Sequence, residues 1–228
     1  MRQLRWILTL TMCALLTSAV QMHAQPQYSV TDLGTLVPYG VNSQAMVVGE
    51  MVLNGQWGPT LWQARQFTAL TSPGGGGQAL GVNDTGEIVG WTSNGQGSGQ
   101  GAYWYQETLI LLDGALPSTA RAINAGHMLA GDRPSRGDTT PPDGCPMAPM
   151  TRCSQHWGGG LSFGNAIEPQ GRVCGRSQAP FMTHAVCWER DGRLTDWGTL
   201  GGNFATFTGA NGEVAVAMGA RSKGCGRS

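Results

Sequence analysis

The sequence predicts an all-β fold made of a repeated unit, and three short phrases that recur together carry this prediction. The first phrase is an apolar residue, Asn, a turn and an apolar run ending in Gly; it begins at Val41, Val82, Ile123 and Ile167. Its Asn residues follow one another at intervals of 41 residues, at Asn42, Asn83 and Asn124. The second phrase, Asp-x-Gly-Thr-Leu, begins at Asp32 and again at Asp196, which is four such intervals later. A repeated period of this kind identifies a repeat architecture.

Each unit contains about four short apolar or aromatic runs, separated by turns rich in Asn, Asp and Gly such as Asp84-Thr85-Gly86. Such runs and turns predict antiparallel strands. A four-stranded unit repeated every ~40–45 residues is typical of a propeller blade. We therefore expect a β-propeller-like array of about five four-stranded repeats of ~41 residues, forming either a closed or an incomplete ring. Leu109–Leu112 is apolar without alternation, which predicts a strand covered on both faces.

The third phrase places a Trp after small or apolar residues, and it ends at Trp62, Trp104 and Trp188. One large aromatic side chain per sheet is suited to fill the space between neighbouring sheets. We interpret these three residues as packing residues between blades. The alternative, a platform on which a ligand stacks, is less suited to a residue that recurs with the repeat.

The two ends of the chain fall outside the repeat. Residues 1–24 carry Arg2 and Arg5, an apolar stretch of about 15 residues and a small residue at Ala24, as in a secretion signal. That stretch is shorter than the ~20 residues of a membrane span. We expect a signal peptide at 1–24, one repeat domain at 25–220 with a Pro-rich loop insertion at 132–156, and a flexible basic tail at 221–228.

The composition excludes several classes of partner. Charged residues make up 12% of the chain, and the formal net charge is zero. Binding to nucleic acid requires a basic surface, so no nucleic-acid partner is expected. We also expect no membrane span after removal of the signal peptide.

The cysteines predict disulfide bonds in an exported protein. Five of the six follow the leader, so at least one is unpaired or bridges two molecules. Cys145 and Cys153 lie in one Pro-rich loop, and we expect a local disulfide between them. No Cys-x-x-Cys or His-x-x-x-His pair is present, and we expect neither a metal nor a cofactor.

The phrases together resemble the HAF-repeat extracellular proteins, a family named after a His-Ala-Phe signature. The best match is His184-Ala185-Val186, with Val for Phe, followed by Trp188, Asp191-Gly192 and the segment Asp196–Gly202. The resemblance implies an exported, bacterial repeat protein with a propeller-like β structure. It brings no established activity, so it assigns no catalytic residues.

The catalytic motifs in the sequence lack their structural context. Gly160–Gly164 fits the Gly-x-Ser-x-Gly pattern, with Ser162 at its centre, and His184 and Asp191 follow it. That motif requires a strand-to-helix turn in an α/β sheet, whereas this one lies in an all-β repeat. His184 also falls at a repeat position that we align with Gly101 and Pro59.

The sequence favours an exported binding or scaffolding module over an enzyme, with a glycan or a protein as ligand. Insertions in repeat proteins map to loops on a binding face, so we expect the ligand at the 132–156 insertion. One alternative is a carbohydrate-active hydrolase with carboxylates at the propeller axis, drawn from Asp84, Asp113 and Asp196. Another is a truncated relative without independent activity. Pairing of the first strand, expected at Tyr28–Leu33, with the last strand, expected at Val214–Met218, would indicate a closed ring.

Overall fold

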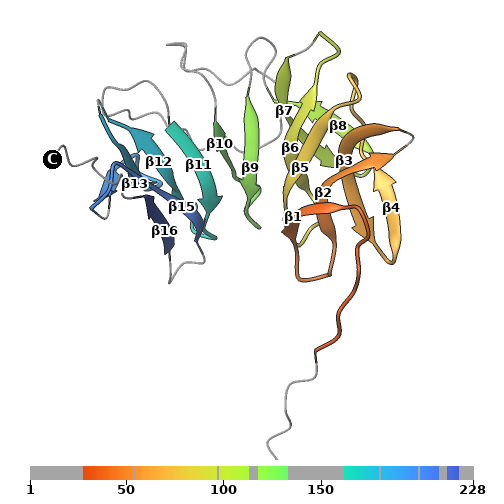
Figure 1. The fold of residues 1–228 in the computed structure, drawn as a ribbon, viewed down its shortest axis with the longest axis horizontal. Coiled ribbons are helices and arrows are strands. Elements are labelled where there is room, and N and C mark those ends of the chain that lie inside the picture. Colours follow the sequence, from red (N-terminus) through yellow and green to blue (C-terminus); the bar gives the residue numbers. More distant parts are fainter. Residues whose placement is uncertain are drawn as a thin grey trace, which may run out of the picture. The chain divides into compact units, whose positions relative to one another are not determined.

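The computed structural model describes most of the repeat region, and every regular element in it is a β-strand (Figure 1). The described residues are 28–53, 55–96, 98–112, 118–132, 162–179, 181–199, 201–210 and 215–220, the last six and Ala210 by backbone alone. The expected signal peptide, the Cys145–Cys153 pair, the 132–156 insertion beyond Asp132 and the 221–228 tail lie outside them. The chain divides into two units, Met1–Gly34 and Thr35–Ser228.

The second unit contains three antiparallel sheets, which confirms the all-β class. The first sheet has strands β1 (Val37–Val41), β2 (Val47–Leu53), β3 (Gln56–Gln63) and β4 (Gln66–Ala69). The second has β5 (Gly77–Val82), β6 (Ile88–Ser93), β7 (Gly99–Tyr105) and β8 (Thr108–Leu111). In both sheets the strands pair in sequence order.

The third sheet joins a hairpin, a four-stranded meander and a second hairpin. The hairpin that comes first in this sheet is β9 (Thr119–Ile123) and β10 (Leu129–Asp132). The meander runs through β11 (Ser162–Ile167), β12 (Val173–Gln178), β13 (Thr183–Trp188) and β14 (Leu194–Gly198). The hairpin that comes last in this sheet is β15 (Phe204–Ala210) and β16 (Ala215–Ala220). Single residue pairs, Asp132 with Phe163 and Thr183 with Phe204, connect the three parts. The described chain therefore holds three four-stranded meanders and two hairpins.

Each meander also begins with a hairpin, so the described chain has five such hairpins: β1–β2, β5–β6, β9–β10, β11–β12 and β15–β16. We number them one to five in chain order. Their first strands are neighbours in that order. β1 lies beside β5, β5 beside β9, β9 beside β11, and β11 beside β15. Tyr28–Leu33 forms no strand, and the only described partner of β16 is β15. The propeller arrangement and the closure of a ring remain predictions.

The repeated Asn explains both the hairpin turn and the period. In Asn42, Asn83 and Asn124 the side-chain oxygen accepts hydrogen bonds from the backbone N–H groups two and four residues later, at 2.9–3.2 Å. Asn side chains favour turns through such local bonds. The side-chain amide of Asn42 also donates to the carbonyl of Asn83, and that of Asn83 to the carbonyl of Asn124. Each Asn thus closes its own hairpin and binds the next one.

The repeated Gly is required by the first strand of the same hairpin. A Cβ atom added to Gly49, Gly90, Gly131 or Gly175 would overlap a backbone carbonyl oxygen of that strand. In each of these hairpins the strand pairing shifts register next to this contact. A β-bulge brings backbones closer than a side chain allows, which explains the choice of Gly.

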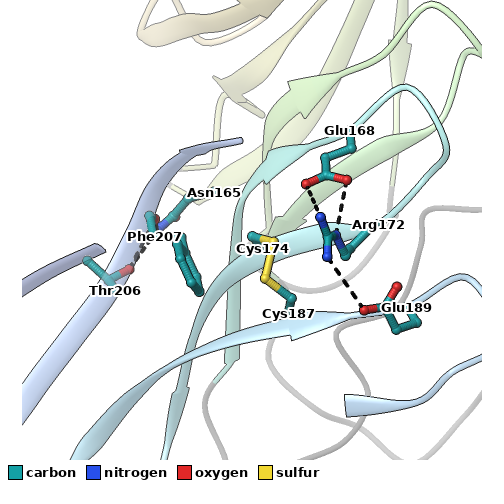
Figure 2. Close-up of a disulfide and its surroundings, with 8 residues drawn as sticks. All are labelled: Asn165, Glu168, Arg172, Cys174, Cys187, Glu189, Thr206 and Phe207. Atoms are coloured by element: carbon teal, nitrogen blue, oxygen red, sulfur yellow. Dashed lines mark hydrogen bonds and ion pairs between the residues drawn. A yellow bond between two sulfur atoms is a disulfide. The ribbon is translucent and has the colours of Figure 1, made fainter. Parts of the chain in front are cut away.

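The fourth hairpin replaces the Asn with an ion pair (Figure 2). Glu168 stands in the Asn position and is buried, and its carbonyl still accepts the amide of Asn124 at 2.9 Å. Its carboxylate accepts hydrogen bonds from Arg172 at 2.7 and 3.0 Å, and Glu189 lies 3.9 Å from the same guanidinium. Because a carboxylate lacks an N–H, the Asn ladder ends here.

A disulfide joins Cys174 of β12 to Cys187 of β13, directly opposite each other in the strand register (Figure 2). Both residues are buried. The sequence did not predict this pair; the expected pair, Cys145 and Cys153, lies outside the described residues. The closed loop of about 14 residues corresponds to roughly 3 kcal/mol of stabilisation.

The three packing Trp residues differ in burial. Trp104 lies in a core cluster with Val48 of the preceding sheet, and Trp188 lies in one with Ala130 of the preceding hairpin. Trp62 is only partly buried, because no described sheet precedes its own. The strand expected to be covered on both faces, Leu109–Leu112, is covered in part: Leu109 packs against one core cluster, and Ile110 and Leu112 pack against another. It corresponds to β8, the outer strand of its sheet, where Leu111 is 38% exposed.

Candidate functional site

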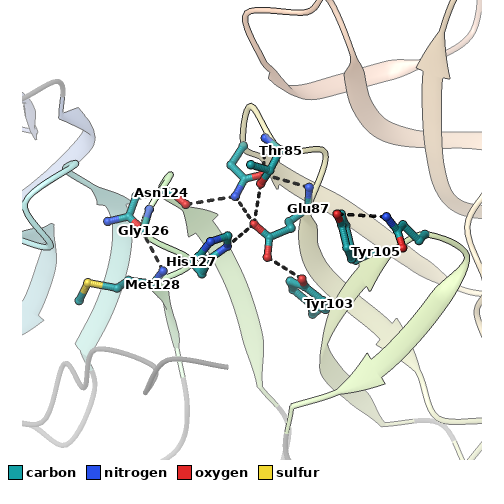
Figure 3. A network of polar contacts seen from close by, with 10 residues as sticks. Thr85, Glu87, Tyr103, Tyr105, Asn124, Gly126, His127 and Met128 are labelled. Carbon is teal, nitrogen blue, oxygen red and sulfur yellow. Dashed lines mark hydrogen bonds and ion pairs between the residues drawn. The ribbon is translucent and has the colours of Figure 1, made fainter. Parts of the chain in front are cut away.

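The most highly connected carboxylate in the described residues is Glu87, at the start of β6 (Figure 3). One oxygen accepts the hydroxyl of Tyr103 at 2.6 Å. The other is 2.5 Å from the amide of Asn83, 2.7 Å from the hydroxyl of Thr85 and 2.6 Å from Nδ1 of His127. His127 belongs to the next hairpin, so this network joins two repeats.

His127 stands where neighbouring hairpins have glycine. Counted from the Asn, its position is occupied by Gly86 in the second hairpin and by Gly171 in the fourth, both with positive φ. His127 adopts φ 62°, a left-handed conformation that costs about 1 kcal/mol for a non-Gly residue. At the equivalent contacts between other hairpins, a methionine of one hairpin lies near this glycine of the next hairpin, as Met128 lies near Gly171. The Glu87–His127 pair therefore replaces an apolar contact and stabilises an unfavourable backbone conformation.

Hydrogen bonds keep the Glu87 carboxylate ionised. Burial by itself raises the pKa of Glu87, but the hydrogen bonds from Tyr103, Asn83, Thr85 and His127 together lower it to about 2. A carboxylate with this pKa and with four donors around it is a poor proton acceptor near neutral pH. The network is suited to hold two hairpins together rather than to general acid–base chemistry.

We expect replacement of Glu87 by Gln to destabilise the protein near neutral pH and to have little effect near pH 2. A pKa lowered from 4.5 to about 2 stabilises the folded state fully above pH 4.5, and this contribution is lost as the pH falls toward 2. It corresponds to at most about 3 kcal/mol. Urea unfolding between pH 7 and pH 2.5 measures it, with Glu107→Gln in an exposed turn as the matched control. A loss that is equal at all pH values would contradict the charge-based explanation.

A second pairing of His with carboxylate connects β13 and β14. Nδ1 of His184 lies 2.8 and 3.0 Å from the two carboxylate oxygens of Asp196, and Asp196 also accepts the N–H of Gly198. Asp191, which follows the Gly-x-Ser-x-Gly motif in sequence, instead accepts the N–H of Arg193 in a turn. Ser162 is buried at the first position of strand β11, which is no strand-to-helix turn. The described geometry does not form a nucleophile elbow.

The strand register corrects the repeat alignment of His184. Trp188 pairs with Val173 as Trp104 pairs with Ile88, so the two Trp residues are equivalent. His184 therefore aligns with Gln100 and not with Gly101. The sequence alignment was wrong by one residue.

The carboxylates considered for a hydrolase have separate partners. Asp84 accepts the backbone N–H of Ser43 at 2.9 Å, which lowers the pKa of Asp84, and Asp196 pairs with His184. No contact among the described residues joins Asp84 to Asp196, and Asp113 lies outside the described residues. A glycosidase pair has no support from these contacts.

Side chains that differ in every repeat lie in one row, one residue beyond the repeated Gly. In four hairpins this residue pairs across the strands with a residue of the first strand. We call the following four pairs the variable row: Val37 with Glu50, Gln78 with Trp91, Thr119 with Asp132, and Phe163 with Arg176. They are partly or fully exposed, and each hairpin contributes different chemistry.

The first half of the row forms a hydrogen-bonded cluster between two sheets. Tyr39 donates its hydroxyl to Glu50 at 2.5 Å, and this bond is the main cause that raises the pKa of Tyr39 to about 12. The amide of Gln78 donates to Glu50 at 3.0 Å, and Trp91 donates to Gln78 at 2.9 Å. We call these four residues the first cluster.

The second half of the row combines arginine with aromatic rings. The Arg176 guanidinium lies 4.1 Å from the ring centre of Phe163 and 5.6 Å from that of Phe204, at the start of β15. Arg121 and Asp132 form an ion pair at 2.6 Å. These five residues are the second cluster. Sequence reasoning missed both clusters, although the change of residue type directly after the repeated Gly was a usable signal.

The described residues indicate neither a metal centre nor a membrane span. Within them, no group of three or more His, Cys, Asp or Glu side chains is placed to hold a metal ion. None of the described segments is a helix with the length and apolar character needed to cross a bilayer. In comparisons with known proteins, no family model, no curated protein and no solved structure matches this chain.

Proposed function

We propose that this chain is an exported HAF-repeat-like protein that works as a binding module, with propeller-like four-stranded units and its ligand on the variable row. The observation that carries the proposal is the contrast between frame and row. The frame repeats Asn for the turn, Gly for the bulge and Trp for packing, whereas the row changes in every hairpin. Repeat proteins use such variable positions on a constant frame for recognition.

The position of the row supports this assignment. It lies on the first and second strands of the hairpins, and the first strands are neighbours in the fold. Tyr39 of the first cluster is 43% exposed, and the polar and aromatic members of the row are partly exposed. Aromatic and amide side chains on a rigid sheet are suited to bind sugars or protein surfaces. The 132–156 insertion starts at Asp132, a residue of the row itself, which is compatible with its expected place near the ligand.

Binding is favoured over catalysis because the two His–carboxylate pairs have structural explanations. Glu87 and His127 connect hairpins, and Asp196 orders the turn at Gly198 while it holds His184. The hydrolase alternative has no comparable observation in its favour.

We expect Tyr39→Ala to weaken ligand binding about tenfold or more while the protein remains folded. Tyr39 is exposed and belongs to the first cluster, where it donates to Glu50 of the row, so its removal takes away a contact with the ligand rather than core packing. The measurement is a screen of the purified chain on immobilised glycans and cell-surface proteins. It is followed by titration of each hit with both variants.

Phe181→Ala is the matched control, because Phe181 is a 92% exposed aromatic residue outside the row. Binding that is unchanged by Tyr39→Ala, or that is lost equally in both variants, would overturn the assignment to the row. A chain that binds nothing in the screen would count against the binding function itself.

A further inference from the structure

The cation at Arg176 is available for an anionic ligand. Arg176 makes no ion pair or hydrogen bond among the described residues, whereas Asp132, whose charge acts on Arg176, is bound to Arg121 at 2.6 Å. The charges of Arg121, Arg176 and Asp132 leave the second cluster with one net positive charge. Arg176 is only partly buried. A ligand carboxylate could therefore reach it from solvent.

The two aromatic rings hold the guanidinium in place. Phe163 lies directly across the strands from Arg176, and Phe204 comes from the next hairpin. Stacking of this kind covers the face of the guanidinium and leaves its N–H groups at the edge. Those N–H groups form a planar fork that matches a carboxylate in two parallel hydrogen bonds.

The electrostatics of the cluster favour an added anion. Burial lowers the pKa of Arg176, and so does the neighbouring charge of Arg121, while Asp132 offsets part of this effect. A partly desolvated cation beside a second cation is stabilised when a carboxylate binds.

We infer that the variable row binds an acidic polysaccharide, with a uronic-acid carboxylate on Arg176 of the second cluster and neighbouring sugar hydroxyls on the first cluster. The inference rests on the proposed binding function and names its ligand class.

Two observations select this class among anionic ligands. The row also carries Glu50, and the chain has a formal net charge of zero. Nucleic acids and densely charged polymers bind through many cations at once, which this row lacks. Sugar hydroxyls both donate and accept hydrogen bonds, as do the amide of Gln78 and the hydroxyl of Tyr39 in the first cluster. An acidic peptide would present further carboxylates to Glu50 and Asp132.

The test is calorimetric titration of the full chain with oligomers of polygalacturonate, alginate and hyaluronan. Each is paired with its carboxyl-reduced, neutral counterpart. We expect at least one acidic oligomer to bind, and its neutral form to bind about tenfold more weakly or worse. Arg176→Gln should reproduce that loss with the acidic oligomer, and Arg176→Lys should recover part of the affinity. Arg193→Gln removes the same charge from an exposed turn outside the row and should bind like the original chain.

Circular dichroism and melting temperature establish that each variant is folded. Equal affinities of Arg176→Gln and Arg193→Gln, or no binding of any acidic oligomer, would overturn the inference. Equally strong competition by poly-glutamate would also overturn it, in favour of an acidic protein ligand. If only a neutral glycan binds, and Tyr39→Ala weakens it, the choice of ligand fails while the proposed binding function stands.

Discussion

Trp104→Ala is expected to destabilise the protein by about 3–5 kcal/mol. Trp104 is 3% exposed and fills the space between β2 of the first sheet and its own sheet, against Val48 and Ala79. Removal of the ring leaves a cavity that two sheets would have to close together. Its Nε1 also donates to the carbonyl of Thr71 at 2.8 Å, and this partly buried hydrogen bond is lost as well. Urea unfolding monitored by far-ultraviolet circular dichroism measures the change.

Trp62→Ala is the matched control for this prediction. Trp62 occupies the equivalent position of the first sheet and is only partly buried, since no described sheet packs before it. The same substitution should therefore cost clearly less there. If both variants lose the same stability, packing between neighbouring sheets does not explain the repeated Trp.

Asn124→Ala is expected to cost about 3–5 kcal/mol, because one buried and two partly buried hydrogen bonds are lost. The buried partner left unsatisfied costs about 1–3 kcal/mol, and each of the other two bonds contributes about 1 kcal/mol. The side chain is 6% exposed. It accepts the N–H groups of Gly126 and Met128 at 3.0 Å (Figure 3). It also donates to the carbonyl of Glu168 at 2.9 Å. Chemical denaturation at neutral pH gives the loss.

Two further variants separate the two roles of Asn124. Asn124→Asp keeps an acceptor for the turn but places an oxygen against the carbonyl of Glu168, so it should remain destabilised through the contact between hairpins. Asn94→Ala removes an Asn that accepts two backbone N–H groups in a loop and has no described bond to another hairpin. It should cost about 1 kcal/mol. If Asn124→Asp is as stable as the original chain, the ladder between repeats does not contribute to stability.

The local features of the fold could be predicted because each is encoded within a few residues and then repeated. The Asn turn and the Gly that follows the next apolar run were recognised as one phrase, and the structure explains both within a single hairpin. Strand coverage was harder to predict. Leu109–Leu112 is apolar throughout, but it is the last strand of its sheet and one face remains partly exposed.

The candidate site could not be predicted, because its contacts join residues from different strands and hairpins. Glu87 contacts His127, which is 40 residues later in the sequence, and Arg176 contacts Phe204 of the next hairpin. Neither pair has a spacing that a local motif search would find. The disulfide shows the same limit. Proximity in the sequence favoured Cys145 and Cys153, whereas Cys174 and Cys187 are joined because they lie opposite each other in the sheet.

The sequence by itself determined the all-β class, the 41-residue period and the residue types of the frame, since hairpin turns, bulges and apolar runs depend on neighbouring residues. Only the tertiary structure decided which side chains meet between hairpins. Cross-strand register controls this, and an error of one residue moves a side chain to the other face of the sheet. The alignment of His184 with Gly101 instead of Gln100 was such an error. The variable row became visible only when the register had placed Glu50, Trp91, Asp132 and Arg176 at one level.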